Sequence, residues 1–302
     1  MTTSSPELPD EVLGATIRYA PIDPPSPDAV AIGSQAWASP DTVWADLLDL
    51  RVMIRGTHEV VVEIPDGADR SLVAPLLYGW ATRILMLHAG TFNLHGSLVR
   101  IGDEHVVIGG HSGAGKSTTV ATLAHERGAT LLIDDVVHVD LVDGRPTARP
   151  FPRPVHLSHE AVARLGIDDP GEQLGEGPLS KFAVDLAEAG GPVPIDRLVT
   201  LICHDPHPSD EWPNPIVPEV APTAESPVVV RDITGGERLR WVVRLANNSG
   251  LSSFGPRSGA FFQWSTSVAS ALPTMEIARL GGADTLDEVC DLVTAGHTGA
   301  VG

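Results

Sequence analysis

The segment at residues 110–118 carries the clearest chemical signal in the chain. It reads Gly-His-Ser-Gly-Ala-Gly-Lys-Ser-Thr and fits the pattern Gly-x-x-x-x-Gly-Lys-Ser without a mismatch. Small residues let successive backbone N–H groups turn inward around phosphate oxygens, and a helix that begins there points its positive end at the same anion. We therefore expect phosphate contacts from Gly110, Ser112, Gly113, Ala114, Gly115, Lys116, Ser117 and Thr118.

Two side chains of this segment have roles that follow from their chemistry. The ammonium of Lys116 can reach the terminal phosphates of a nucleotide, and Ser117 offers a hydroxyl oxygen to Mg²⁺. A glycine-rich turn that fits the pattern by chance is the alternative. The segment lies, however, between the apolar stretch at residues 106–108 and a stretch of helical character at residues 118–127. This strand–loop–helix context favours nucleotide binding.

An acidic pair, Asp134 and Asp135, directly follows the apolar stretch at residues 131–133. A strand that ends in acids places carboxylates at the carboxyl edge of a sheet, where phosphates and a metal ion would bind. One acid can organise Mg²⁺ and its waters, while the other can accept a proton from an attacking hydroxyl. An acidic turn without a function is the alternative, and the glycine-rich segment upstream argues against it.

Other polar residues give weaker signals. His95 precedes the glycine-rich segment by one predicted strand, and a lone histidine is more often structural. His156 and His159 have a spacing that suits a metal pair, but no third ligand is evident. Lys181 suits either a phosphate contact or a solvated surface position. One of five arginines near the C-terminus could neutralise transition-state charge: Arg231, Arg238, Arg240, Arg244 or Arg257.

The elements that must position these residues alternate between strands and helices, which predicts an α/β fold. Apolar runs predict strands at residues 60–64, 94–99, 106–108, 131–133 and 239–245, with an edge strand at 228–231. Helical spacing predicts helices at residues 70–88, 118–127, 261–272 and 285–295. Pro75 belongs in the first turn of its helix, and Thr285 is a plausible helix cap.

Composition narrows the class of partner. The 302 residues include 20 Lys and Arg against 39 Asp and Glu, which gives a net charge of −19 and argues against nucleic acid or a membrane surface. The two cysteines, Cys203 and Cys290, fit a reducing compartment. The N-terminus lacks the pattern of a signal peptide, and the apolar stretch at residues 72–87 is too short to span a bilayer. We therefore expect a cytoplasmic protein.

Three motifs in sequence order resemble the catalytic domain of the HPr kinase/phosphorylase family, whose shorter relatives include kinases of peptide natural products. They are Leu-His-Gly-Ser-Leu-Val at residues 94–99, the glycine-rich segment, and Leu-Ile-Asp-Asp at residues 132–135. The resemblance covers residues 84–140, with a weaker echo at residues 181–201. It implies a P-loop kinase core on a mixed sheet, similar to phosphoenolpyruvate-carboxykinase-related kinases.

The resemblance also implies roles for single residues. His95 is similar to the family's active-site histidine, and Lys116 to its phosphate-loop lysine. Asp134 is similar to the acid that accepts the hydroxyl proton, Ser117 to the Mg²⁺ ligand, and Asp135 would support the metal shell. The chain lacks the family's later glycine-rich signature, which carries a second metal-binding glutamate.

On this basis we divide the chain into five parts. They are an extended or poorly ordered lead-in (1–40), an N-terminal α/β portion (41–90), the P-loop kinase core (91–204), a proline-rich acidic loop (205–227), and a C-terminal strand and helices that complete the kinase domain (228–302). The fourth part contains seven prolines and five acidic residues without a Lys or Arg, which is typical of a surface loop or linker.

The predicted function is an ATP- and Mg²⁺-dependent kinase that transfers the γ-phosphate to a hydroxyl, with Asp134 as the general base. The expected acceptor is a Ser or Thr of a peptide or protein, or a small metabolite. The sequence is compatible with a homo-oligomer. A nucleotide-switched regulatory ATPase is the alternative, and a binding protein that keeps the loop without transfer is a third class. The chain has no Asn-Lys-x-Asp motif for guanine, which argues against a GTPase.

Overall fold

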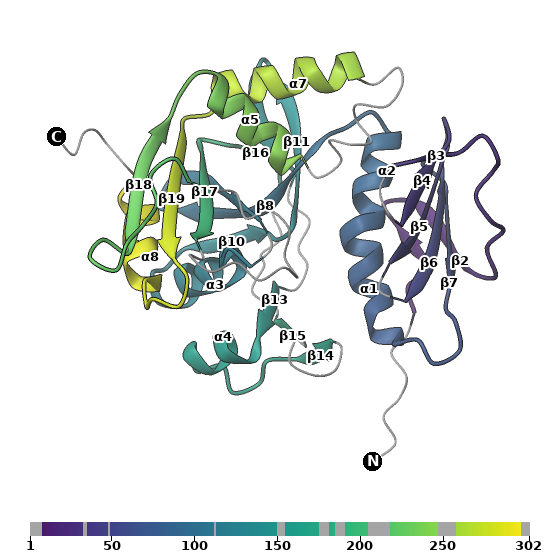
Figure 1. Cartoon of the computed structure of the whole chain (residues 1–302), viewed down its shortest axis with the longest axis horizontal. Coiled ribbons are helices and arrows are strands. Elements are labelled where there is room, and N and C mark those ends of the chain that lie inside the picture. The colour runs from purple at the N-terminus through teal and green to yellow at the C-terminus, as the bar shows by residue number, and fades with distance from the viewer. Residues whose placement is uncertain are drawn as a thin grey trace. The chain divides into compact units, whose positions relative to one another are not determined.

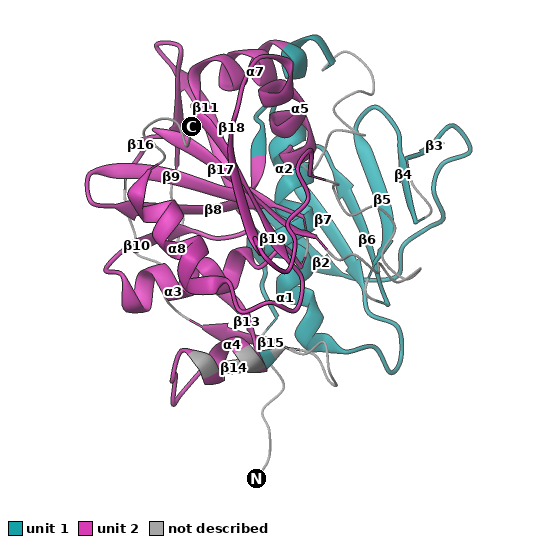
Figure 2. Cartoon of the chain, turned by 60° about the vertical axis from the view of Figure 1, so that its left-hand side comes forward, with its two compact units in different colours: residues 1–93, 173–180, 247–262 teal, residues 94–172, 181–246, 263–302 magenta. Residues whose placement is uncertain are grey.

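The computed structural model divides into two compact units (Figure 2). Unit 1 comprises residues 1–93, 173–180 and 247–262, and unit 2 comprises residues 94–172, 181–246 and 263–302. Across both units, the structure describes residues 8–32, 35–47, 49–111, 113–149, 155–174, 181–184, 191–204, 218–246 and 258–296. Within those ranges no helix is both long and apolar enough to cross a membrane.

Unit 1 is built on a seven-stranded sheet with the order β1-β2-β7-β6-β5-β4-β3. Its strands are β1 (Glu11–Val12), β2 (Ala15–Tyr19), β3 (Val30–Ala31), β4 (Ala36–Ala38), β5 (Thr42–Leu47), β6 (Leu50–Arg55) and β7 (Glu59–Glu63). Strand β7 confirms the strand predicted at residues 60–64. In β6, Leu50, Val52 and Ile54 alternate with less buried residues, as a sheet covered on one face requires.

A helical segment packs against this sheet (Figure 1). It consists of η1 (Arg70–Leu72), α1 (Val73–Leu76), the π-helical turn η2 (Leu77–Ala81) and α2 (Thr82–His88). Asp69 begins it by accepting a hydrogen bond from the backbone N–H of Ser71. Leu77, Ala81 and Ile84 follow one another at helical spacing and are fully buried. The predicted helix at residues 70–88 is thus confirmed.

The expected lead-in at residues 1–40 needs correction, because strands on both sides of residue 40 form one sheet. Strand β2 pairs in parallel with β7, and β4 pairs with β5, where Trp37 lies opposite Trp44. Strands β1 to β4 contain two to five residues each, and the connection between β2 and β3 contains four prolines. Alternation over so few residues gives little periodic signal, so these strands form through pairing with their longer neighbours.

Unit 2 contains a mixed sheet of nine strands in the order β16-β12-β11-β8-β9-β17-β19-β18, with β10 paired to β8. The strands are β8 (Asn93–Ile101), β9 (Glu104–Gly110), β10 (Thr130–Ile133), β11 (Val136–Val142), β12 (Arg145–Ala148), β16 (Val193–Pro194), β17 (Arg197–His204), β18 (Val228–Ile233) and β19 (Thr274–Leu280). Strands β9, β17 and β19 run parallel to one another, whereas β8, β10 and β18 are antiparallel to their partners. The predicted mixed α/β class is confirmed.

Helices cover both faces of the unit 2 sheet (Figure 1). Helices α3 (Lys116–Glu126) and α8 (Leu286–Ala295) share one apolar core with Ile277 of β19. The neighbouring Glu276 points to the opposite face, where it accepts a hydrogen bond from Trp241 of α5 (Gly236–Leu245). Helix α7 (Ser258–Ala271) is anchored by Trp264, whose indole N–H donates to the carbonyl of Val139.

A smaller element lies beside α3. Strands β13 (Val155–Ser158) and β15 (Lys181–Val184) pair antiparallel, and helix α4 (His159–Arg164) follows β13 directly. The Ser158 side chain caps α4 by accepting a hydrogen bond from the backbone N–H of Ala161. Strand β14 comprises Glu172–Leu174.

Most predicted elements of unit 2 are confirmed, with one clear error. The confirmed elements are β8, β9, α3, β10, α7, α8 and the edge strand β18. Residues 239–245 were predicted as a strand but belong to α5, where Trp241, Val242 and Leu245 form the buried stripe. Adjacent valines and an aromatic favour a strand locally, and helical packing against the sheet overrides that preference. Of the predicted loop at 205–227, residues 205–217 lie outside the described residues, and 218–227 contain no helix or strand.

Candidate functional site

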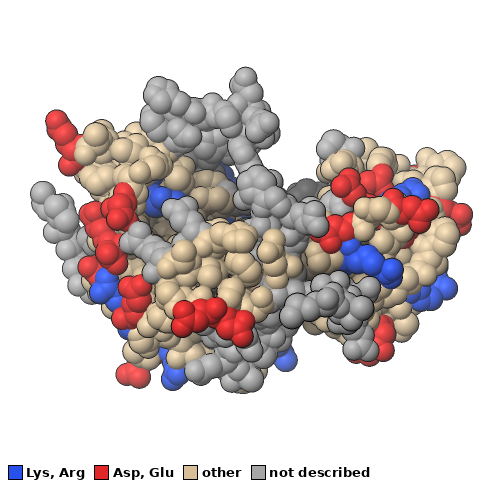
Figure 3. Space-filling view, turned by 90° about the horizontal axis from the view of Figure 1, so that it is seen from below, with Lys and Arg blue, Asp and Glu red and all other residues tan. Residues whose placement is uncertain are grey.

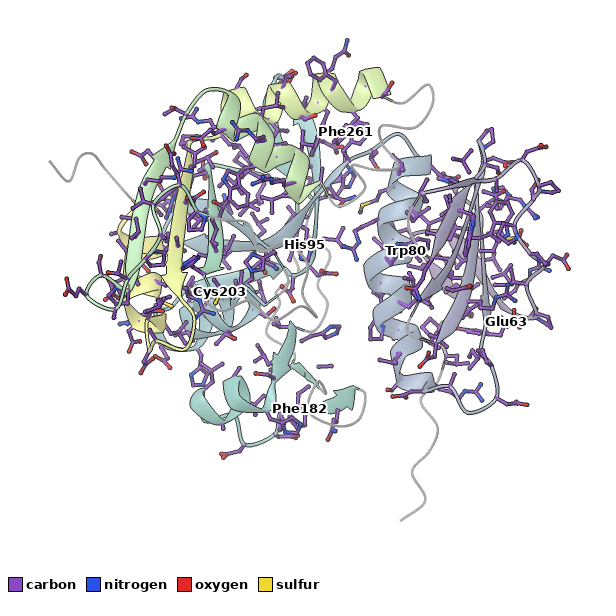
Figure 4. The ribbon with its side chains drawn as sticks, viewed as in Figure 1. Glu63, Trp80, His95, Phe182, Cys203 and Phe261 are labelled. Atoms are coloured by element: carbon purple, nitrogen blue, oxygen red, sulfur yellow. The ribbon has the colours of Figure 1, made fainter. Side chains whose placement is uncertain are left out.

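The glycine-rich loop, His95 and the acid pair lie at one edge of the unit 2 sheet. The parallel strands β9 and β17 both end there, and the antiparallel strand β8 begins there, with Gly96 opposite Gly109. Strand β10 pairs with the other side of β8 and runs antiparallel to it, so β10 also ends at this edge. The loop after β9, the start of β8 and the acids after β10 are therefore neighbours. Figure 4 labels His95 at the start of β8. In open α/β sheets such an edge is where ligands bind.

Two glycines of the loop are required by its geometry. Gly110 has φ 152°, and a Cβ there would lie 2.5 Å from the carbonyl oxygen of Leu201 in β17. Gly115 has φ 94° and precedes α3, and its Cβ would lie 3.1 Å from the guanidinium of Arg279. Side chains at either position would clash or strain the backbone, so the loop holds its path only with glycine. Ser112 lies outside the described residues.

Lys116 is the first residue of α3 and is only 9% exposed. Its Nζ donates hydrogen bonds to the carbonyl oxygens of Gly110, at 2.9 Å, and His111, at 3.0 Å. These bonds hold the ammonium along the start of the loop, beside the positive end of the α3 dipole. Ser117 and Thr118 follow in the first turn, both partly exposed. The loop thus concentrates positive charge at the end of α3.

His111 shows the effect of this charge. Burial, followed by the charges of Lys116 and Arg279, lowers the pKa of His111 below its ordinary value of 6.5. Its Nδ1 is buried without a hydrogen-bond partner among the described residues. The imidazole is therefore neutral at pH 7, and a bound anion would act in the opposite direction on its pKa.

The two acids after β10 occupy different surroundings. Asp134 is 6% exposed, and its Oδ1 accepts a hydrogen bond of 2.6 Å from the hydroxyl of Ser97 in β8. Asp135 has φ 68°, and the backbone N–H of Val136 donates to the carbonyl of Asp134 at 2.9 Å, which closes a tight turn around Asp135. A non-glycine residue with positive φ is strained, and such residues concentrate at functional sites.

His95 lies against the second acid. Its Nδ1 is 3.0 Å from Oδ1 and 3.2 Å from the carbonyl oxygen of Asp135. The backbone N–H of Gly96 donates to the same carbonyl at 3.2 Å. The side chains of His95 and Asp135 are 19% and 31% exposed, so both can be reached from solvent. Strand β8 therefore positions both acids, Asp134 through Ser97 and Asp135 through His95 and Gly96.

The oxygen donors of Ser117, Asp134 and Asp135 suit Mg²⁺ better than a metal ion whose ligands all come from the protein. The described part of the chain contains no cluster of three His, Cys, Asp or Glu that could hold a metal ion. Mg²⁺ is commonly bound by one or two carboxylates together with waters and substrate phosphates, and Ser117 with the acid pair offers that kind of set. His159 instead packs edge-on against Phe182, with ring centroids 4.6 Å apart, which is a structural contact.

The arginines that the sequence singled out have other partners. Arg231 forms ion pairs with Glu219, Glu237 and Glu276. Its hydrogen bond to Glu276, followed by that to Glu237, raises its pKa. Arg244 lies over the ring of Trp241, 5.7 Å from its centroid. Arg238 donates to the carbonyl of Ile233, and Arg240 is exposed, while Arg257 and the side chain of Lys181 lie outside the described residues. The cluster around Arg231 is thus neutralised internally.

Arg279, for which the sequence predicted no role, is a cation beside the loop. Its Nε donates to the carbonyl of Ala114 at 3.2 Å, and its guanidinium borders Gly115. It is the penultimate residue of β19, the third parallel strand. The sequence did contain a signal that could have identified Arg279, because it is a basic residue near the carboxyl end of an apolar strand. Asp134 and Asp135 were identified by the same kind of signal.

Comparison with known proteins agrees with the motif resemblance. The chain is 31% identical over 162 residues to the HPr kinase/phosphorylase of Treponema pallidum, with the same values for two strains of that organism. The aligned region covers 51% of this chain and 49% of that protein, so the chain spans about half the length of the curated relatives it matches. No family model matches the chain.

A solved structure, the HPr(Ser) kinase/phosphatase from Coxiella burnetii, matches with a TM-score of 0.31 and 13% identity, covering 67% of this chain and 94% of that one. The class that the fold defines is a mixed α/β protein with a glycine-rich loop between a strand and a helix. Over about half of its length the chain is similar to HPr kinase/phosphorylase, in agreement with the resemblance of the three motifs.

Proposed function

We propose that the protein is an ATP- and Mg²⁺-dependent kinase that transfers the γ-phosphate of ATP to a hydroxyl group. The observation that carries this proposal is that β8 lies between β9 and β10, and so brings the Lys116 loop and the acid pair to one sheet edge. The similarity to HPr kinase/phosphorylase supports it. A P-loop kinase needs cations and backbone N–H groups on the phosphates and a carboxylate near the attacking hydroxyl.

The loop would bind the phosphates. Backbone N–H groups of Gly113 to Ser117 and the positive end of α3 attract the anion, while Lys116 reaches the terminal phosphates. These donors are held in place before substrate arrives, Lys116 by two carbonyls and Gly115 by its left-handed backbone. Donors fixed in this way stabilise the charge that develops on the transferring phosphoryl group without further reorganisation.

Asp134 would accept the proton of the acceptor. The hydroxyl oxygen attacks the γ-phosphorus, the bond to the β,γ-bridging oxygen breaks with its electron pair leaving on ADP, and the proton moves to the Asp134 carboxylate. Ser97 fixes the orientation of that carboxylate through its 2.6 Å hydrogen bond. Asp135, which is more exposed and lies beside His95, suits the metal shell together with Ser117. Mg²⁺, when bound, neutralises phosphate charge.

The charge of the protein favours a particular kind of acceptor. The net charge is −19, and Asp and Glu side chains are spread over both units on the face drawn in Figure 3, with Lys and Arg among them. Such a field attracts a neutral or basic acceptor, either a peptide or a small metabolite, more readily than an acidic one. The cytosol supplies ATP and keeps Cys203 and Cys290 reduced, which supports a cytoplasmic location.

The roles of the two acids can be separated by substitution. Asp134→Asn should keep ATP affinity while turnover falls about a hundredfold or more, because the base is lost and the shape is kept. Asp135→Asn should instead raise the Mg²⁺ concentration needed for half-maximal turnover. ATP titrations by calorimetry and turnover at several Mg²⁺ concentrations measure both effects, and Asp140→Asn, a surface acid paired with Arg149, is the control. Normal turnover in Asp134→Asn would contradict the proposed base.

A further inference from the structure

A pocket of about 520 Å³ opens in unit 2 beside the start of α3. Gly115, Thr118 and Thr119 line it from the α3 side. Residues 282–285 between β19 and α8, the start of α8, and the start of α4 also line it. The volume lies within the range of about 300–1,000 Å³ that is common for small-molecule sites.

The pocket continues directly from the glycine-rich loop. Gly115 is the last residue of that loop, and Thr118 lies in the first turn of α3. A nucleotide whose phosphates lie against this helix end must extend its ribose and base away from the loop. The pocket offers enclosed space for them at the loop's own end.

An unpartnered hydroxyl inside the pocket points to a ligand. Thr285 lines the pocket, is 3% exposed, and its Oγ1 makes no hydrogen bond among the described residues. It occupies the cap position of α8, as the sequence predicted, but its side chain makes no capping bond. Buried polar groups without a partner are rare in native proteins. A ligand that fills the pocket would give this hydroxyl its partner.

The remaining walls suit a flat aromatic group. Arg279 lines the pocket, and its bond to the carbonyl of Ala114 holds the guanidinium beside the loop. Guanidinium groups stack on aromatic rings and also pair with phosphates. Ala161, Leu286 and Val289 add apolar surface. These features suit a nucleotide base: Arg279 can stack on its ring, the apolar residues can pack against it, and the Thr285 hydroxyl can bond to its polar edge.

We propose that this cavity, the nucleoside pocket, binds the ribose and purine base of the nucleotide whose phosphates the loop holds. The proposal rests on the proposed function, because it takes the loop to bind a nucleotide. Arg279 lies over the base, and the Thr285 hydroxyl hydrogen-bonds to its polar edge. Because of these contacts, the protein should have a higher affinity for a nucleoside triphosphate than for tripolyphosphate, which lacks the ribose and base.

The test compares ATP with inorganic tripolyphosphate, measured by calorimetry on the full chain. Wild type should bind ATP more tightly than tripolyphosphate. Thr285→Val should weaken ATP binding roughly three- to tenfold, as expected for one lost hydrogen bond, and leave tripolyphosphate binding unchanged. Thr285→Ser should restore ATP binding. Thr294→Val is the control, because Thr294 lies on the same helix and bonds to the carbonyl of Cys290.

The outcomes separate the pocket from the loop. Equal affinity of wild type for ATP and tripolyphosphate, with both lost in Lys116→Ala, would overturn the nucleoside pocket and leave the proposed loop function standing. Equal weakening of both ligands in Thr285→Val would also overturn it, since that pattern reports a general disturbance. Binding of neither ligand by wild type would overturn the proposed function itself.

Discussion

The Arg231 cluster and the sheet edge with Lys116, both in unit 2, hold buried or partly buried charges and arrange them differently. Around Arg231, one cation faces the carboxylates of Glu276, Glu237 and Glu219, and Trp241 adds a hydrogen bond to Glu276. At the sheet edge, by contrast, Lys116 is held by two carbonyl oxygens. The charge of Arg231 is matched by carboxylates within the protein, whereas the two carbonyls fix the ammonium of Lys116 beside the positive end of α3.

The backbone shows the same contrast. Strands β18 and β19, which carry Arg231 and Glu276, pair without a break in register over six residue pairs. The sheet edge instead holds Gly110, Gly115 and Asp135 at positive φ. Glycine adopts this conformation freely, whereas Asp135 is strained by it, and such strain persists only where the surroundings enforce it and is found mostly at functional sites. On this comparison we propose that the Arg231 cluster stabilises the fold and that the sheet edge binds the ligand.

The largest expected effect is that of Lys116→Ala. Loss of the ammonium should reduce phosphate transfer by about a hundredfold to a thousandfold, because it removes preorganised charge from the terminal phosphates. Steady-state kinetics measure this, and circular dichroism checks that the fold is kept. Arg149→Ala, which removes a surface cation paired with Asp140, is the control. Unchanged transfer in Lys116→Ala would break the assignment of the loop as the site.

Glu276→Gln tests whether the Arg231 cluster stabilises the fold. Its carboxylate is buried and bonds to both Arg231 and Trp241, so its neutralisation should lower the free energy of unfolding by about 1–3 kcal/mol. Urea unfolding measures this loss. Turnover at low temperature should stay near the wild-type value. Glu237→Gln, a more exposed partner of Arg231, should change stability less. If Glu276→Gln lost turnover without losing stability, the Arg231 cluster would belong to the functional site and would not be purely structural.

The smallest effect concerns pH. Burial lowers the pKa of His111 and His138, so the folded protein binds fewer protons than the unfolded chain just below their ordinary pKa of 6.5. Their contribution to stability is therefore present above that pH and is lost as the pH falls through the lowered pKa. His111→Gln should reduce the difference in unfolding midpoint between about pH 7.5 and about pH 5.5. An unchanged or larger difference would contradict the neutral state of His111.

Much of the candidate site could be predicted because its parts lie within contiguous motifs. The loop, Asp134 and Asp135 each follow directly from an apolar strand, and strand ends are visible as short apolar runs. Whether these residues catalyse a reaction stays a prediction. Ser97 was part of a motif but had no assigned role, because its bond to Asp134 depends on the pairing of β8 with β10.

Arg279 and Thr285 could not be selected in this way. Arg279 reaches the loop across 165 residues of sequence, through the parallel order of β9, β17 and β19. Thr285 is identified only by its burial without a hydrogen bond, which is a property of packing. Helix α5 was mistaken for a strand for a related reason, since the sheet it packs against decides its conformation.

The central claim is phosphoryl transfer, and a labelled-phosphate assay tests it most directly. The protein would be incubated with γ-phosphate-labelled ATP, Mg²⁺ and size-fractionated cell extract, in parallel with Asp134→Asn. The account predicts label in a peptide, protein or small-molecule fraction with wild type and at least a hundredfold less with the variant. Label released only as free phosphate, whichever fraction is added, would contradict the kinase and favour a nucleotide-switched ATPase.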